Sequence, residues 1–168
     1  MKNKELRNIV FCALLIALVI IGTIIIRIPI PAVAGYVHFG DLFIFLGSCI
    51  FGPIIGGIAG GLGSASADIL VGASQWAVFS LIIKSLIGFV VGKFAYKHKF
   101  HSLRNLIGII IAIVILVIGY YIVGSILLGS FKAGLVSIPY DIAQGVVSGV
   151  VYFVIGEKIS KIKIIKGE

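Results

Sequence analysis

The stretch that decides the fold is LFIFLGSCIFGPIIGGIAGGLGSASA, residues 42–67, which runs for 26 residues without a charge. One membrane-crossing helix needs only about 20 apolar residues, and Gly52-Pro53 in the middle of the stretch is a pair that breaks helices. A single long span would place the basic residues at 93–104 on the outer face of the membrane, whereas Lys and Arg concentrate in inner loops. We therefore interpret the stretch as two helices joined by a tight inner turn.

The remaining apolar stretches extend this pair to six helices. Of the 168 residues, 60% are hydrophobic and only 12% are charged, which excludes a water-soluble globular domain. The long Ile, Leu, Val and Gly runs do not alternate with polar residues, which argues against a transmembrane barrel. The sequence predicts an all-α polytopic membrane protein with one embedded domain, residues 1–168, and spans at about 9–26, 39–51, 54–71, 76–92, 106–128 and 138–156.

The formal net charge of +8 reflects basic residues that flank the apolar stretches. They form three clusters: Lys2, Lys4 and Arg7; Lys93, Lys97, Lys99 and Arg104; and Lys158, Lys161, Lys163 and Lys166. By the positive-inside rule all three lie in the cytoplasm, together with both termini. No soluble segment is long enough to bind nucleic acid. The longest outward connection, 27–40, contains two of the four prolines and is expected to form an ordered cap over the outer face.

Ionisable residues inside spans are costly and therefore mark candidate functional sites. Asp41, Asp68, Lys84 and Asp141 all fall in the outer half or the middle of the predicted bundle, while the inner half is almost free of such groups. This asymmetry predicts a pocket that opens to the outside and is closed beneath by apolar packing. The candidate substrate-binding residues are Tyr36, His38, Asp41, Asp68, Trp76, Ser80, Lys84, Tyr140, Asp141 and Gln144.

Three carboxylates against one ammonium favour a neutral or cationic ligand over a polyanion, and aromatic walls suit a small heteroaromatic molecule. Other interpretations stay open for single residues. Trp76 is also typical of the aromatic belt at a membrane interface. Asp41 and Asp141 are also typical of helix N-caps. Asp68 and Lys84 are also typical of a structural ion pair. His38 is also typical of an ordinary loop residue.

Two further features concern partners. Ala13 and Ala17 form a small-xxx-small pair on an otherwise bulky first span, and such pairs permit close helix packing, here against another membrane protein. The chain has no phosphate-binding loop and no hydrolase or metalloprotease motif. We expect no enzyme activity, no cofactor and no metal site, and any transport must draw energy from a partner.

Three stretches carry a family resemblance: YVHFGD at 36–41, FGPIIGGIAGGLGSASADIL at 51–70, and W-x7-K-x3-G-x3-G from Trp76 to Gly92. With them the chain resembles the substrate-capture (S) components of bacterial energy-coupling factor (ECF) vitamin transporters, riboflavin-type subfamily. The resemblance implies high-affinity vitamin capture at the outer face of the cytoplasmic membrane. It also implies association with a coupling transmembrane subunit and two ATPase subunits. Ala13 and Ala17 match the family's A-x-x-x-A, which contacts the coupling subunit.

The expected ligand is a B vitamin or a precursor, with hydroxymethylpyrimidine, pyridoxine and riboflavin ahead of anionic vitamins. Two alternatives remain open at this point. A membrane scaffold or assembly protein would use the outer polar residues structurally, and a stand-alone permease would transport without ATPases.

Overall fold

The structure is a computed structural model that describes residues 2–30 and 35–160, with side chains for 5–30, 35–156 and 158–159. The chain begins with helix α1 (Lys2–Ile25), followed by strands β1 (Arg27–Ile30) and β2 (Gly35–His38). The longer helices that follow are α2 (Gly40–Phe51), α3 (Pro53–Leu70), α4 (Ser74–Ala95), α5 (Leu103–Leu127) and α7 (Ile138–Ser160). Pro31, Lys161, Lys163 and Lys166 lie outside the described residues, as do the side chains of Lys2 and Lys4.

Five segments of the described chain are long and apolar enough to cross a membrane: Glu5–Ile25, Pro53–Leu70, Ser74–Ala95, Leu103–Leu127 and Phe131–Gly156. Helix α2 is apolar but has only 12 residues, about 18 Å at 1.5 Å per residue. The protein is thus an all-α polytopic membrane protein in its main architecture. In the part of the chain that the structure describes, six apolar helices overlap the six predicted spans, and the second is shorter than the hydrocarbon core of about 30 Å.

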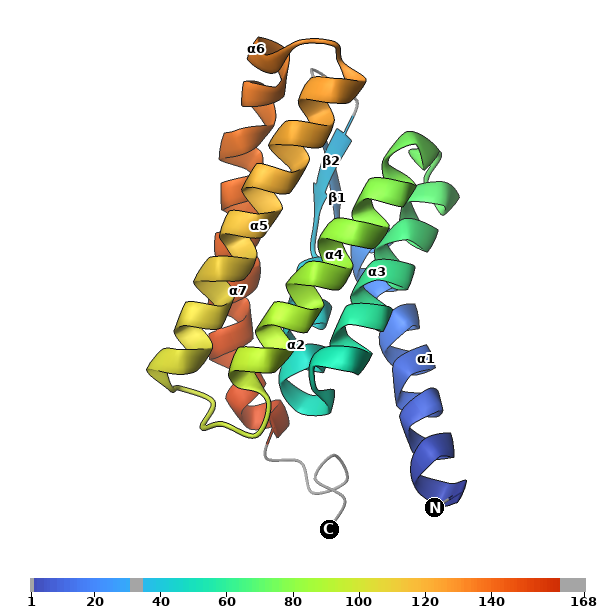
Figure 1. The fold of residues 1–168 in the computed structure, drawn as a ribbon, viewed down its shortest axis with the longest axis vertical. Coiled ribbons are helices and arrows are strands. Elements are labelled where there is room, and N and C mark those ends of the chain that lie inside the picture. The colour runs from blue at the N-terminus through green and yellow to red at the C-terminus, as the bar shows by residue number, and fades with distance from the viewer. Residues whose placement is uncertain (1, 31–34, 161–168) are drawn as a thin grey trace.

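The predicted turn between the second and third helices is present. Gly52 has a φ of 93°, a left-handed conformation that glycine adopts without strain, and its N–H donates to the Ser48 carbonyl at the end of α2. Pro53 is the first residue of α3, where its missing N–H costs nothing. In Figure 1 this turn lies at the same end of the molecule as the start of α1, the α4–α5 loop and the end of α7.

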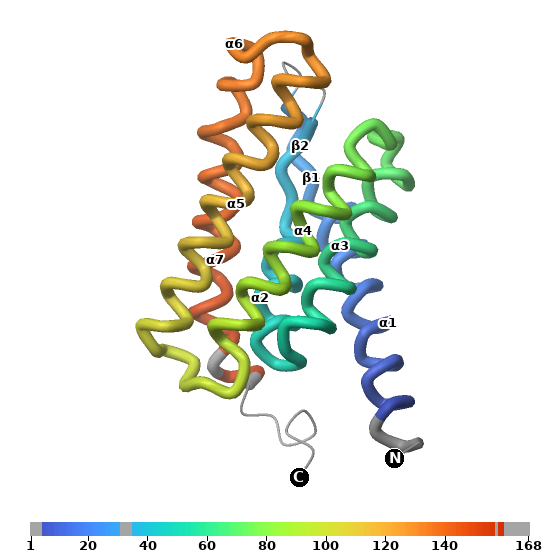
Figure 2. The backbone as a smooth tube through the Cα atoms, viewed as in Figure 1, coloured from blue at the N-terminus to red at the C-terminus, as the bar shows by residue number. Residues whose placement is uncertain are grey.

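The connection between α1 and α2 differs from the expected cap. It forms an antiparallel hairpin in which Arg27 pairs with His38 and Ile30 with Gly35. Figures 1 and 2 show the two strands between the α5–α7 pair and the α3–α4 pair, so the hairpin is part of the wall of the bundle. The connection between the predicted spans 106–128 and 138–156 also contains structure, the short helix α6 (Phe131–Gly134) and a 3-10 helix (Leu135–Ser137).

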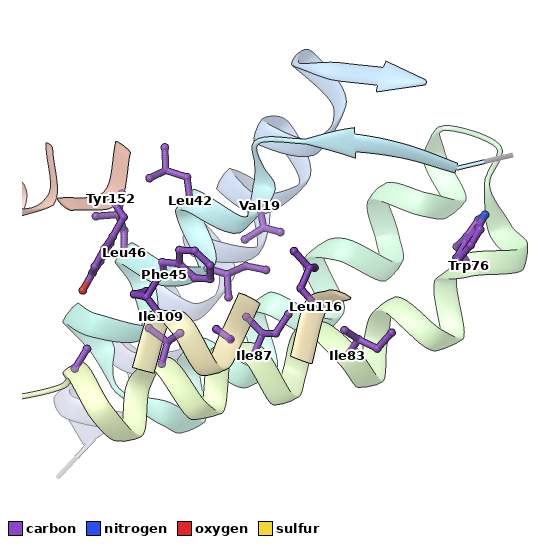
Figure 3. Close-up of a cluster of buried hydrophobic side chains, with 14 of the residues drawn as sticks. Val19, Leu42, Phe45, Leu46, Trp76, Ile83, Ile87, Ile109, Leu116 and Tyr152 are labelled. Carbon is purple, nitrogen blue, oxygen red and sulfur yellow. The ribbon is translucent and has the colours of Figure 1, made fainter. Parts of the chain in front are cut away.

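Glycines bring α3 and α4 into backbone contact. A Cβ on Gly88 would lie 2.2 Å from the Gly56 carbonyl oxygen, and one on Gly60 would lie 2.8 Å from the Lys84 carbonyl oxygen. Without side chains between them, the two backbones approach more closely than larger residues allow. The large apolar core lies alongside, with Val19, Phe45 and Ile87 among its buried members (Figure 3).

Candidate functional site

A cavity lies at the end of the bundle that holds the β-hairpin. Its empty volume is about 450 Å³, a figure that includes the open space at its mouth. The hairpin, α3, α4, α5, the 3-10 helix and α7 all contribute to it. Its lining residues are Ile30, Gly35, Tyr36, His38, Asp68, Trp76, Tyr120, Ser137, Asp141 and Gln144.

Six of the ten candidate residues line this cavity: Tyr36, His38, Asp68, Trp76, Asp141 and Gln144. Asp41, Ser80 and Lys84 are buried next to them and do not line it. Tyr140 is 43% exposed and is also absent from the lining, because its position in α7 turns it away from the cavity that its neighbour Asp141 reaches. The structure therefore separates the candidates into a lining set, a buried set behind it, and Tyr140 outside.

Tyr120 is the main lining residue that the sequence did not single out. Its ring lies 5.9 Å from that of Trp76, and its hydroxyl is 2.8 Å from the Ser80 hydroxyl. The Lys84 ammonium lies 5.2 Å from the centre of the Tyr120 ring. The available signal was the tyrosine pair Tyr120 and Tyr121 within a predominantly apolar helix. The two rings form an aromatic wall beside the polar groups of the cavity.

Asp68 on α3 is held by the hairpin. The Tyr36 hydroxyl donates a hydrogen bond to Asp68 Oδ1. The Arg27 guanidinium lies 5.5 Å from the centre of the Tyr36 ring and donates to the Val71 carbonyl at 3.3 Å. These contacts fasten the hairpin to the end of α3. Burial, followed by the hydrogen bond to Asp68, raises the pKa of the Tyr36 phenol, so that it remains a hydrogen-bond donor.

Two carboxylate oxygens in this cavity lack a hydrogen-bond partner among the described residues: Asp68 Oδ2 and Asp141 Oδ2. Both atoms are buried, and a buried acceptor without a partner costs about 1–3 kcal/mol. The Ser48 and Ser64 hydroxyls are the other buried atoms of this kind in the described part of the chain, and neither residue lines the cavity. The two aspartates can therefore accept hydrogen bonds from a molecule in the cavity.

Asp41 and Lys84 form a buried ion pair behind the lining. The Lys84 ammonium lies 2.5 Å from Asp41 Oδ1, and both side chains are fully buried. This pair replaces the predicted alternative in which Lys84 pairs with Asp68. The interpretation of Asp41 as an N-cap is also wrong, because α2 has Phe39 as its N-cap residue and no side-chain capping bond. Of the three carboxylates assigned to the pocket, Asp41 is thus neutralised by Lys84, the ammonium that was assigned with them.

Gln144 joins this pair to strand β2. Its Nε2 donates to Asp41 Oδ2 at 2.7 Å, and its Oε1 accepts from the His38 backbone N–H at 2.8 Å. The His38 ring accepts from the Gly40 N–H through Nδ1 at 3.0 Å. Burial, followed by the nearby Lys84 ammonium, lowers the pKa of His38 to about 3. His38 is therefore neutral at physiological pH. It lies in strand β2 and lines the cavity, rather than lying in a loop.

Ala13 and Ala17, the predicted docking residues, are both exposed on α1. The opposite side of the helix packs into the bundle through Leu15 and Val19, which are 4% and 0% exposed. The alanine face thus makes little contact within the chain.

Comparison with known proteins identifies the family. The family described as "ECF-type riboflavin transporter, S component" matches residues 3–161. A protein of Pyrococcus woesei described as "uncharacterized protein in gap 3'region" is 41% identical over 133 residues, 79% of this chain and 87% of its own length. The "thiamine precursor transporter HmpT" of Lactococcus lactis is 27% identical over 168 residues, 99% of this chain and 96% of its own length.

A UPF0397 protein of Streptococcus pneumoniae is 33% identical over 135 residues, 79% of this chain and 72% of its own length. The family match spans nearly the whole chain and agrees with the helical membrane architecture. The chain therefore belongs to the ECF-type riboflavin transporter S-component family and is a transporter component rather than an enzyme.

Proposed function

We propose that the cavity binds a B vitamin or a precursor of one, and that hydroxymethylpyrimidine, a thiamine precursor, is the best candidate. The family itself indicates vitamin-type uptake across a membrane. The observation that carries the proposal is the pair of buried carboxylate oxygens, Asp68 Oδ2 and Asp141 Oδ2, which have no partner among the described residues and belong to residues of one aromatic-lined cavity.

The chemistry of this ligand matches the cavity. An aminopyrimidine with a hydroxymethyl group has N–H and O–H donors for two carboxylates, and its flat ring can pack against Trp76 and Tyr120. A polyanion would meet two uncompensated acids instead. The name of the Lactococcus lactis relative, a thiamine precursor transporter, also supports this ligand class. Pyridoxine and riboflavin, which also carry donors on aromatic rings, remain the next candidates.

We further propose that the cavity faces the outside of the cell and that both termini are cytoplasmic. The support is the positive-inside rule applied to Arg7, Lys93, Lys97, Lys99 and Arg104. The chain has no nucleotide-binding motif, so transport would use ATP hydrolysed by two ATPase subunits that join through a coupling transmembrane subunit. Ala13 and Ala17 form the proposed contact with that subunit, in the plasma membrane.

The experiment is a binding titration that uses the protein's own fluorescence. Trp76 is the single tryptophan of the chain and lines the cavity, so its emission reports occupancy. Purified protein in detergent is titrated with hydroxymethylpyrimidine, pyridoxine, riboflavin and folate. We expect saturable quenching with hydroxymethylpyrimidine at the lowest concentration and none with folate. Tightest binding of folate, or of another polycarboxylate or phosphate, would contradict the proposal.

The site assignment is tested with Asp141→Asn. Loss of one charged acceptor is expected to weaken binding by about tenfold or more, because hydrogen bonds to charged groups contribute about 1.5–3 kcal/mol. The matched control is Glu5→Gln, which removes an exposed carboxylate from the far part of α1. If the two variants bind the ligand with equal affinity, Asp141 does not contribute to binding.

A further inference from the structure

A chain of hydrogen bonds leads from the cavity wall into the buried interior. It begins at the His38 backbone N–H on β2, passes through the Gln144 side chain on α7 and the Asp41 carboxylate on α2, and ends at the Lys84 ammonium on α4. The three side chains are at most 8% exposed. The consecutive elements β2 and α2 are thereby joined to α4 and α7, which are distant in sequence, through one buried polar path.

The groups of this path bond to one another and to strand β2 inside the protein. Both ends of the Gln144 amide and both oxygens of Asp41 have protein partners. Lys84 is fully buried, and neither Lys84 nor Asp41 lines the cavity. Because neither end of the ion pair lines the cavity, the path is better suited to holding protein segments together than to contacting a ligand.

The path also has a direction. An ionised carboxylate only accepts hydrogen bonds, so Asp41 requires the Nε2 end of the Gln144 amide. The Oε1 end then points to strand β2, where the His38 N–H needs an acceptor. The Lys84 ammonium 2.5 Å away favours the ionised form of Asp41. If the amide turned over, an NH2 group would face an N–H group and the bond to β2 would be lost.

We propose that Lys84, Asp41 and Gln144 are positioning residues, a clasp that fixes strand β2 against α7, and that Lys84 makes no contact with the ligand. The clasp places two lining residues of β2, Tyr36 and His38, at the cavity. The inference rests on the proposed function only where ligand binding is the measurement. Attachment of the strand can be measured without any ligand.

The test exploits the direction of the path with two single variants and their combination. In Asp41→Asn the Lys84 ammonium takes the remaining oxygen of the new amide, whose NH2 then faces Gln144 and forces that side chain to turn over. In Lys84→Met the Asp41 carboxylate loses its compensating charge. In the double variant Lys84→Met/Asp41→Asn the new amide is free to present its oxygen to Gln144 Nε2, which restores the bond to β2.

The first measurement is hydrogen exchange of the ligand-free protein, followed by mass spectrometry of the peptide that contains His38. Each single variant is expected to speed exchange at this strand by about tenfold, the effect of losing one or more hydrogen bonds, and the double variant to return it to within about threefold of the wild-type rate. Exchange at α5, which contributes no residue to the path, serves as the internal control.

The second measurement is the dissociation constant from Trp76 fluorescence. Binding in the double variant within about threefold of wild type, with both single variants at least about tenfold weaker, supports the clasp. If the double variant is as weak as Lys84→Met, the lysine contacts the ligand and the proposal is overturned. If a single variant does not fold, Gln144→Met decides the question, because unchanged exchange at β2 in that uncharged variant also overturns the proposal.

The failure of the proposed function gives a different result. In that case the wild-type protein binds none of the four compounds, while the exchange pattern of the variants still decides whether the clasp exists.

Discussion

Gly88→Ala tests whether close backbone packing between α3 and α4 determines the stability of the bundle. The added methyl group would lie 2.2 Å from the Gly56 carbonyl oxygen, 2.5 Å from its carbonyl carbon and 2.9 Å from the Gly57 nitrogen. All three are backbone atoms, so no side chain can turn away to make room. The two helices have to separate.

The size of the effect follows from these distances. An ordinary van der Waals contact of a Cβ is 3.4–4 Å, so the backbones must separate by about 1 Å, and overpacking of this kind costs about 1–3 kcal/mol. Alanine also has a higher helix propensity than glycine, by about 1 kcal/mol. The matched control is Gly124→Ala in α5, where the new Cβ would lie 3.6 Å from the Trp76 ring. The gain in helix propensity is common to both variants and cancels in the comparison. The free energy of unfolding of Gly88→Ala should therefore be lower than that of Gly124→Ala by about 1–3 kcal/mol.

The assay is heat treatment of each purified variant followed by size-exclusion chromatography. The readout is the temperature at which half of the folded protein peak is lost. For a chain of this size 1 kcal/mol corresponds to about 2–4 °C, so we expect Gly88→Ala to fall below Gly124→Ala by several degrees. Its ligand affinity should be unchanged below that temperature, because Gly88 lies 12 residues along α4 from Trp76, about 18 Å away. Equal midpoints for the two variants would refute the packing argument.

The other predictions concern pH and docking. The pKa of His38 is about 3 in the folded protein and 6.5 in the unfolded chain. Below pH 6.5 the unfolded chain therefore binds a proton that the folded protein does not, and stability falls with decreasing pH by up to about 1.4 kcal/mol per unit. The midpoint of heat treatment at pH 7, 6 and 5 should fall more steeply in the wild type than in His38→Asn, and parallel curves would show that His38 titrates normally. On α1, Ala13→Trp is expected to abolish co-purification with the coupling subunit and to preserve ligand affinity. The control Ile24→Trp, at an exposed position near the other end of α1, should retain the partner, and co-purification of the Ala13 variant would show that the docking face is elsewhere.

The position of the cavity was predictable because few charges occur in this chain. A membrane-embedded chain tolerates an ionisable group only where protein or ligand surrounds it. Asp68 and Asp141 could therefore be assigned to a pocket from their position along the spans. Trp76 and Gln144 could be assigned to the pocket from helical spacing. Trp76 shares a helix face with Ser80, and Gln144 shares one with Asp141. These four residues line the cavity in the structure.

The hairpin was not predictable in the same way. Four-residue strands carry too little periodicity to be distinguished from an ordered loop, and the pairing of β1 with β2 is visible only in the tertiary structure. Tyr140 shows the related limit for helices. It is adjacent to Asp141 in sequence, yet about 100° of helix rotation separates the directions of the two side chains, and only packing decides which of them reaches the cavity.

The sequence by itself determined the membrane architecture, the turn at Gly52-Pro53 and the end of the bundle that holds the polar groups. These properties follow from hydropathy, backbone chemistry and the cost of burying charge, which act locally along the chain. The tertiary structure alone decided which charges pair. The sequence leaves open a pairing of Lys84 with Asp68, whereas in the structure Lys84 on α4 pairs with Asp41 on α2. With Lys84 held by Asp41, Asp68 Oδ2 and Asp141 Oδ2 have no partner among the residues that the structure describes, and both can accept hydrogen bonds from a molecule in the cavity.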